Sequence, residues 1–328
     1  MTEPNYRVGL VMIGRNEGAR LIACLASIGD LRQRAIYVDS GSLDGSQARA
    51  MAAGVQVLEL GPDVPFTAAR ARDMGFEALL RRWPELDYVQ FVDGDCALDP
   101  NWVDAGGALL DARPKLALAC GRRRERYPER SVYNAMCDRE WDGPTGSILE
   151  CGGDFLVRVE AFSEIGGFRS SLIAGEEPEL CLRLRERGWD LWRMPREMTL
   201  HDANIIHFGQ WWRRAVRAGH AFAEVSWLHR ASPKRIWQRQ VLRALLWAAL
   251  LPITLIACLV TPWALLLLLA YPINVARQAF RGGPRSGEAW RDALFAVLGK
   301  LPEAQGILKY HWHRLVGARA SLIEYKSP

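Results

Sequence analysis

The chain has 328 residues, of which 49% are hydrophobic and 24% are charged, a globular balance that excludes a disordered or collagen-like protein. Seven cysteines without C-x-x-C spacing are too few for a disulfide scaffold and do not indicate a zinc ribbon. The net charge of +5 is uneven: residues 1–204 carry 25 Lys or Arg and 32 Asp or Glu, whereas residues 205–328 carry 17 and 5.

Short apolar runs alternate with helical segments along residues 6–200. The predicted strands are 8–13, 35–38, 55–60 and 88–92, and the predicted helices are 17–28, 46–53 and 67–82. This alternation predicts an α/β domain with a parallel sheet wrapped by helices.

Polar residues follow three of these strands, at the edge where such sheets bind ligands. The three groups are Arg15-Asn16-Glu17, Asp39-Ser40-Gly41 and Asp93-Gly94-Asp95. Neither the dinucleotide fingerprint nor the P-loop pattern occurs after the first strand, where the sequence reads IGRNEGAR. The sequence therefore favours neither NAD binding nor a P-loop ATPase.

Two carboxylates lie two residues apart in FVDGDC, directly after the strand 88–92. Mg²⁺ and Mn²⁺ prefer oxygen ligands and often bridge to substrate phosphates. Asp93 and Asp95 are therefore candidate metal ligands. The alternative is an ordinary Asp-Gly turn whose second aspartate is solvated.

Six segments in order resemble family-2 glycosyltransferases with the GT-A fold. They are VMIGRNEGARLIACLASI, YVDSGSLDGS, FTAARARDMGF, FVDGDC, CGGDFLVRVEAFSEIGGF and AGEEPELCLRLRERGW, within residues 6–200. The resemblance implies a GT-A catalytic domain with a Rossmann-like mixed sheet. In membrane-attached bacterial-type members, an amphipathic interface helix and an apolar hairpin follow.

The resemblance also implies a site for a nucleotide-diphosphate sugar and a Mn²⁺ or Mg²⁺ ion. The matching sugar-nucleotide positions are Arg15, Glu17, Asp39, Arg70, Arg72, Asp93 and Asp154. Arginine suits phosphate recognition, although a solvated helix face is the alternative for the pair at 70 and 72. The implied metal ligands are Asp95, Asp93 and His201; the alternative for the histidine is a cap at a strand end.

GEEPELCLRLRERGW matches the segment in which the family usually has a Glu-Asp pair, whereas this chain has Glu176-Glu177. The resemblance implies that one of the two is the base that deprotonates the acceptor hydroxyl in an inverting transfer. We favour Glu177, which occupies the family's aspartate position. Glu179, Arg183 and Arg187 are expected on a solvated helix face with i,i+4 ion pairs.

Residues 244–276 form a run of 33 residues without a charged side chain, broken by Thr261-Pro262. One kinked span and a hairpin of two short helices both fit its length, and a buried core helix pair is a third possibility. Arginines on both flanks favour the hairpin, transmembrane or re-entrant, with both ends cytoplasmic. The basic C-terminal part beside it favours a membrane surface over nucleic acid.

Residues 208–229 predict an amphipathic helix with an apolar stripe that suits the membrane–water boundary. The stripe is Trp211, Ala215, Ala218, Phe222 and Val225. Processive synthases carry Q-x-x-R-W near this point, but here Arg214 replaces the tryptophan after Gln210 and Arg213. This difference favours transfer of a single sugar to a lipid-linked or membrane-near acceptor.

The expected organisation has four parts. They are a catalytic domain (1–204), an interface helix region (205–240), a membrane hairpin (241–278) and a basic tail with amphipathic helices (279–328). We expect the protein at the inner membrane with its catalytic domain in the cytoplasm. Arg122–Arg124 are expected to meet an acidic or phosphorylated acceptor. The alternative functions are a sugar-phosphate nucleotidyltransferase and a non-catalytic membrane scaffold.

Overall fold

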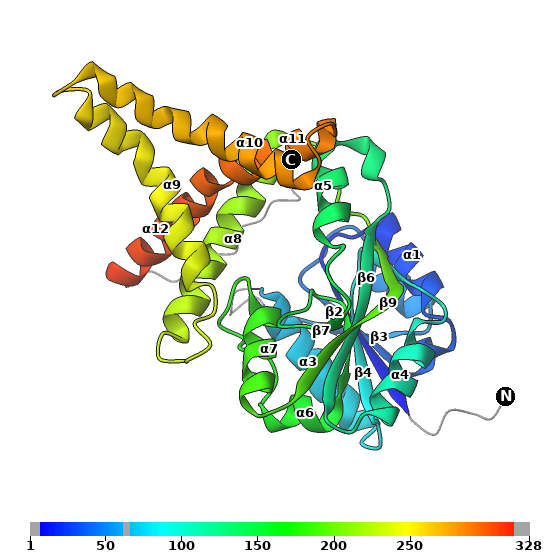
Figure 1. The fold of residues 1–328 in the computed structure, drawn as a ribbon. Coiled ribbons are helices and arrows are strands. Elements are labelled where there is room, and N and C mark those ends of the chain that lie inside the picture. The colour runs from blue at the N-terminus through cyan, green and yellow to red at the C-terminus, as the bar shows by residue number, and fades with distance from the viewer. Residues whose placement is uncertain (1–6, 62–65, 318–328) are drawn as a thin grey trace. The chain divides into compact units, whose positions relative to one another are not determined.

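The computed structural model describes residues 7–61 and 66–317 (Figure 1). Two compact units make up the chain, Met1–Ile206 and His207–Pro328, and each is described by itself. Part of the expected C-terminal tail, residues 318–328, lies outside the described residues.

The first unit is built on a nine-stranded mixed sheet with the order β3-β2-β1-β4-β8-β6-β9-β5, in which β7 also pairs with β9. The strands are β1 (Val8–Gly14), β2 (Ala35–Asp39), β3 (Gln56–Glu59), β4 (Tyr88–Asp93), β5 (Cys96–Leu98), β6 (Leu116–Glu125), β7 (Gly146–Ser147), β8 (Phe155–Arg158) and β9 (Asp190–His201). Strands β1 to β4 run parallel to their neighbours within that group, whereas β8 is antiparallel to both β4 and β6. This is the mixed GT-A sheet that the resemblance implied.

Helices cover both faces of this sheet (Figure 1). They are α1 (Ala19–Ser27), α2 (Ser46–Ala52), α3 (Ala68–Arg82), α4 (Trp102–Ala112), α5 (Val132–Glu140), α6 (Val159–Glu164) and α7 (Glu176–Glu186), with short 3-10 turns η1 (Gly29–Arg34) and η2 (Pro128–Arg130). The elements predicted for residues 8–92 end within two residues of those observed, and Thr67 caps α3 by accepting from the Arg70 amide.

Neighbouring residues of the central strand β4 show how the two faces are filled, because side chains alternate along a strand. Phe91 packs against Phe76 of α3 and Phe162 of α6 on one face. On the other face, Gln90 accepts a 2.8 Å hydrogen bond from the Trp102 indole of α4. A sheet buried on both sides leaves its strand ends as the place for a polar site.

The second unit is helical, with α8 (Phe208–Leu228), α9 (Gln238–Ala257), η3 (Pro262–Leu269), α10 (Ala270–Gly282), α11 (Gly287–Leu298) and α12 (Lys300–Leu315). Helices α8 and α12 cross so closely that a Cβ on Gly219 or Gly306 would collide with backbone atoms of the other helix. The face of α8 that this crossing buries includes Val216 and His220, whereas Ala215 and Ala218 of the predicted stripe are only half-buried.

Helix α9 and the continuous pair η3–α10 are each long and apolar enough to cross a membrane, and only 11% of each apolar window is buried. Residues such as Leu255, Ile256 and Leu266 are exposed. This exposure contradicts the alternative of a buried core helix pair.

We predict that Gly306→Ala destabilises the helical unit by about 1–3 kcal/mol, because its methyl group would overlap the Val216 carbonyl oxygen. Gly287→Ala is the matched control, since a Cβ there meets nothing within 4 Å. Thermal unfolding followed by helical circular dichroism checks this. A Gly306→Ala protein as stable as the wild type would show that the helices can separate at no cost.

Candidate active site

The strand register brings the predicted polar groups to one edge of the sheet. Asp39 pairs with Gly14 between β2 and β1, and Asp93 pairs with Ile13 between β4 and β1. The loops that follow β1, β2 and β4 therefore begin side by side, as their spacing in the sequence predicted.

The loops after β1 and β2 are tied together by hydrogen bonds. The Asn16 amide donates to Ser42 Oγ at 2.8 Å, and Asn16 Oδ1 accepts from the Leu43 amide at 2.8 Å. Arg15 lies over the ring of Phe66 at 5.5 Å, and Glu17 forms an ion pair with Arg20 at 2.9 Å.

Asp39 is fully buried and its carboxylate accepts from four donors. Oδ1 accepts from the amides of Gly41 and Ser42 and from Gln47 Nε2, and Oδ2 accepts from the Tyr37 hydroxyl. This carboxylate therefore holds the loop after β2 in shape, a role that the sequence analysis did not assign to it.

A buried guanidinium joins three carboxylates from distant segments. Arg72 Nη2 donates to Asp93 Oδ1 at 2.7 Å, and Arg72 Nη1 donates to one oxygen each of Glu176 and Glu177 at 3.0 Å. The ring of Phe168 lies 5.6 Å from the same guanidinium. The solvated helix face that was the alternative for Arg72 is therefore wrong.

Arg123 of β6 completes this cluster, although the sequence analysis placed it among acceptor-facing residues. Its Nη2 lies 2.8 Å from Asp154 Oδ2 and 3.2 Å from Asp93 Oδ2. Asp154 is buried, accepts from the Asp93 amide at 2.9 Å and accepts from the Thr199 hydroxyl at 2.7 Å. The sequence signal for this position was the run of three arginines, Arg122–Arg124, which does not by itself single out Arg123.

Glu177 is the member of the acidic pair more open to solvent, with 14% of its side chain exposed against 5% for Glu176. Burial, together with the neighbouring charge of Glu176, raises the pKa of Glu177 to about 7 against the opposing effect of Arg72. A carboxyl group that titrates near neutral pH is suited to accept a proton in a reaction.

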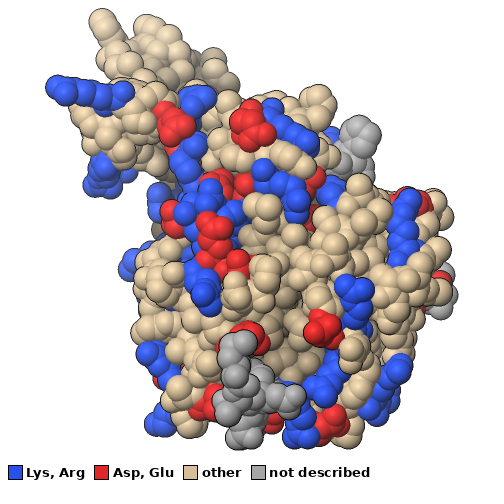
Figure 2. Space-filling model, turned by 90° about the vertical axis from the view of Figure 1, so that its right-hand side faces the viewer, with Lys and Arg blue, Asp and Glu red and all other residues tan. Residues whose placement is uncertain are grey.

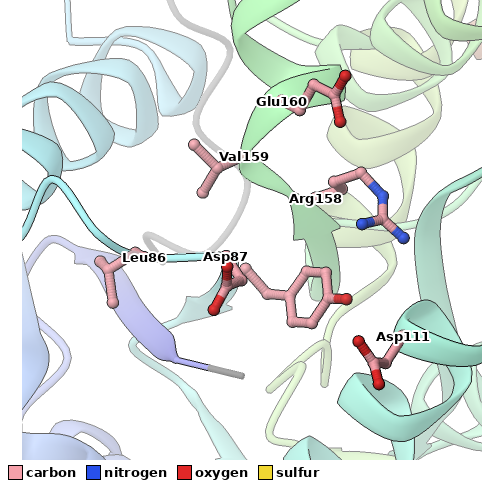
Figure 3. Close-up of a pocket in the computed structure, with 7 residues that line it drawn as sticks. Leu86, Asp87, Asp111, Arg158, Val159 and Glu160 are labelled. Carbon is pink, nitrogen blue, oxygen red and sulfur yellow. The ribbon is translucent and has the colours of Figure 1, made fainter. Parts of the chain in front are cut away.

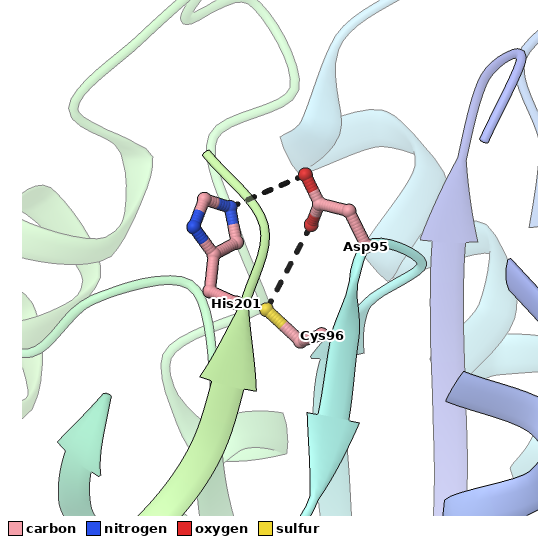
Figure 4. Close-up of side chains that lie close together, drawn as sticks. All are labelled: Asp95, Cys96 and His201. Atoms are coloured by element: carbon pink, nitrogen blue, oxygen red, sulfur yellow. Dashed lines mark hydrogen bonds and ion pairs between the residues drawn. The ribbon is translucent and has the colours of Figure 1, made fainter. Parts of the chain in front are cut away.

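Asp95 and His201 meet at the ends of the antiparallel pair β5 and β9 (Figure 4). His201 Nε2 lies 3.2 Å from Asp95 Oδ2, and the thiol of Cys96 lies 3.7 Å from Asp95 Oδ1. The three residues are buried and close enough to hold one ion. Asp93, Cys96 and Asp154 are also close enough to hold one, although Asp93 is only half-buried. Burial raises the pKa of the Cys96 thiol well above its usual value, so the oxygen and nitrogen donors are the better ligands.

Three further arginines make contacts that the sequence analysis did not specify. Arg70 donates to the Gly61 carbonyl, whereas Arg122 and Arg124 both pair with Asp138. Glu179 is fully buried between Arg169 and Arg183, so its predicted i,i+4 pair exists but its predicted solvation is wrong. Figure 2 shows basic and acidic side chains interspersed over one face of the molecule.

A separate hollow lies at the opposite edge of the sheet, where β4 begins and β8 ends (Figure 3). Its lining includes Asp87, Asp111 and Arg158, and the guanidinium of Arg158 donates to the carbonyls of Leu110 and Leu116. Asp93 occupies the other end of β4, so this hollow is not part of the candidate active site.

The mixed sheet, with a polar cluster at the ends of its strands, has the GT-A fold of glycosyltransferases. Residues 10–172 match the model for glycosyl transferase family 2, and the chain belongs to this family. No curated protein sequence matches the chain significantly.

Two solved structures are similar to the chain at low sequence identity. The mannosyltransferase PcManGT from Pyrobaculum calidifontis, in complex with GDP-Man and Mn²⁺, is 16% identical with a TM-score of 0.63, covering 95% of this chain and 89% of that one. Glucosyl-3-phosphoglycerate synthase from Mycobacterium tuberculosis, in complex with Mn²⁺, UDP and glucosyl-3-phosphoglycerate, is 18% identical with a TM-score of 0.46, covering 67% of this chain and 78% of that one.

We predict that Gly153→Ala lowers activity about tenfold or more, because a Cβ at this position would lie 2.6 Å from Arg72 Nη2 and 2.8 Å from Asp93 Oδ2. Gly152→Ala is the control, because a Cβ one residue earlier meets nothing within 4 Å. Hydrolysis of nucleotide-sugars with added Mn²⁺ measures the effect. Equal activities of the two variants would show that the cluster tolerates displacement.

Proposed function

We propose that this glycosyltransferase is an inverting, metal-dependent enzyme that transfers one sugar from a nucleotide-diphosphate sugar to a lipid-linked or membrane-near acceptor. The observation that carries the proposal is the cluster in which Arg72 holds Asp93, Glu176 and Glu177 together, beside Asp95 and His201. It supplies a candidate base, candidate metal ligands and two guanidiniums at one sheet edge.

The donor set suits a divalent cation. Asp95 and His201, with Asp93 nearby in sequence, would hold Mn²⁺ or Mg²⁺, and an imidazole ligand favours Mn²⁺ of the two. The ring of Trp141 contacts His201 edge-on, with 4.9 Å between the ring centroids, and His201 Nδ1 lies 3.8 Å from Glu125 Oε2. These contacts would hold the imidazole in place as a ligand. When bound, such a cation stabilises negative charge on the departing nucleotide diphosphate.

The donor would lie along the loops after β1 and β2. We propose that Arg15, Glu17 and Asp39 form the side of the site that receives the nucleotide, with Asp39 acting through the loop that it holds. Arg70 and Arg72 would contact or position the diphosphate, since one guanidinium can donate two hydrogen bonds to the oxygens of one phosphate. Asp154 would contact or position the sugar. Arg123 joins them in this proposal because it shares Asp93 and Asp154 with the cluster.

Glu177 is the proposed base. Its carboxylate would take the proton of the acceptor hydroxyl while that oxygen attacks the anomeric carbon and the bond to the diphosphate oxygen breaks. Its greater exposure and raised pKa support this assignment over Glu176. Arg72 bonds both carboxylates, so Glu176 would orient the guanidinium that also orients the base.

The helical unit is the proposed membrane attachment. Its two candidate spans with exposed apolar residues, and the arginines beside them, support an inner-membrane location with the catalytic domain in the cytoplasm. The domain boundaries that accompany this proposal are 1–204, 205–240, 241–278 and 279–328.

We predict that Glu177→Gln lowers turnover by about 10²–10⁴-fold and leaves nucleotide binding near normal, because the base acts on the acceptor. Glu176→Gln should be milder. The wild-type rate should fall as the pH drops through about 7, since a raised pKa leaves Glu177 protonated below that value. The measurement is turnover across pH with binding titrations for each variant, and a reversed order of severity would exchange the two roles.

We predict that Asp95→Asn lowers activity about 10²-fold or more, since the amide keeps the shape but loses the anionic ligand. Chelation by EDTA should abolish wild-type activity, and added Mn²⁺ should restore it. Binding of Mn²⁺, followed by its electron paramagnetic resonance, gives a second readout that does not depend on turnover. Full activity in EDTA would contradict the metal assignment.

A further inference from the structure

The tip of the apolar hairpin carries hydrophobic side chains on the outside. Residues 258–261 join α9 to η3, and Leu259 and Val260 there are 87% and 89% exposed. Trp263, at the start of η3, is also exposed. A turn that emerges into water between two spanning helices is normally polar, whereas this one has no charged side chain.

The backbone of the tip satisfies its own hydrogen-bond donors. The amides of Cys258, Leu259, Val260 and Thr261 donate to carbonyls of residues 254, 256 and 257, at 2.9–3.1 Å. Pro262 has no N–H to satisfy. Groups buried in hydrocarbon must be paired within the protein, because no water is available there.

Two polar side chains within the hairpin, those of Thr254 and Tyr271, also bond to backbone carbonyls. The Thr254 hydroxyl donates to the Leu250 carbonyl at 2.7 Å, and the Tyr271 hydroxyl donates to the Trp247 carbonyl at 2.6 Å. The second bond links the two legs of the hairpin, since Tyr271 lies on α10 and Trp247 on α9.

Both helices are long enough to cross a bilayer, but the part of each that lacks a charged side chain is shorter than the hydrocarbon core. The uncharged part of α9, Ala244–Ala257, spans about 21 Å at ~1.5 Å per residue. The uncharged return, Pro262–Ala276, spans about 26 Å because its first half is a 3-10 helix. The hydrocarbon core is ~30 Å thick, and a tilt of the legs shortens their reach further.

Exposed arginines flank the uncharged run 244–276 on both sides. They are Arg239 and Arg243 before the run, and Arg277 and Arg281 after it. These arginines would bind the anionic headgroups of one leaflet. The two apolar segments would then enter the hydrocarbon directly beside the headgroups.

We propose that residues 244–276 form a re-entrant hairpin, which enters the bilayer from the cytoplasmic face and ends inside the hydrocarbon without reaching the opposite surface. Its partner is therefore the lipid of the membrane itself, with anionic headgroups around the arginines. This inference rests on the membrane attachment proposed above and specifies its depth.

The test uses the exposed tip as a reporter of depth. Six of the seven cysteines are buried, so a Cys258→Ser background leaves few reactive thiols. Val260→Cys then places a thiol at the tip, and Leu43→Cys, at a position 95% exposed in the first unit, is the matched control. Each purified protein is added to preformed vesicles of phosphatidylethanolamine and phosphatidylglycerol, with a membrane-impermeant maleimide either outside or sealed inside.

We expect Leu43→Cys to react with outside reagent only, and Val260→Cys to react with neither until detergent is added. Reaction of Val260→Cys with the sealed reagent would show a spanning hairpin, and reaction with the outside reagent would show a tip that never enters lipid. Either result overturns the proposal. If the wild type does not float with the vesicles, membrane attachment itself fails, whereas the transferase assay is unaffected.

A charged tip provides a second measurement. Val260→Asp should reduce the vesicle-bound fraction about tenfold or more, since an aspartate inside hydrocarbon is costly. A Val260→Asp protein that binds vesicles as the wild type does would contradict an embedded tip.

Discussion

The candidate active site depends on the interactions of one buried group, the guanidinium of Arg72. It joins α3 to the end of β4 and to the start of α7. Arg72 and Glu177 are 105 residues apart in the sequence. A charge removed from water is costly unless it is paired and hydrogen-bonded, and here three carboxylates supply the pairing. Each partner in turn depends on Arg72, so loss of the guanidinium would leave several buried carboxylates repelling one another.

The cluster has more negative than positive groups. Arg72 and Arg123 face four carboxylates, those of Asp93, Asp154, Glu176 and Glu177. Burial is the main cause of the raised pKa of Glu177, and the charge of the neighbouring Glu176 adds to it. The excess of carboxylates also favours a cation close by, so the proposed base and the proposed metal site are compatible at one edge.

The sequence predicted the first half of the sheet and its polar edge, because periodic apolar runs and the rule for strand ends are local. It could not identify Arg123 among three consecutive arginines. Strand β6 shifts its register against β9 between Cys120 and Arg122 and again between Arg122 and Arg123. Such irregularities decide which side chain turns toward the site, and they arise from long-range pairing. Glu179 was misjudged for a similar reason, since Arg169 reaches it from outside its helix.

The depth that the hairpin reaches in a membrane also cannot be predicted from hydropathy, because it depends on the hydrogen bonding of the turn. A spanning hairpin and a re-entrant one of equal length have the same mean hydropathy, so the apolar run alone leaves both open. They differ at the turn, where a spanning hairpin exposes backbone groups to water and a re-entrant one has to satisfy them internally. The paired amides from Cys258 to Thr261, beside the exposed Leu259 and Val260, meet this requirement for the backbone donors. Pairing of the same kind operates at Arg72 in the first unit, where two guanidinium nitrogens that are out of contact with water bond three carboxylates.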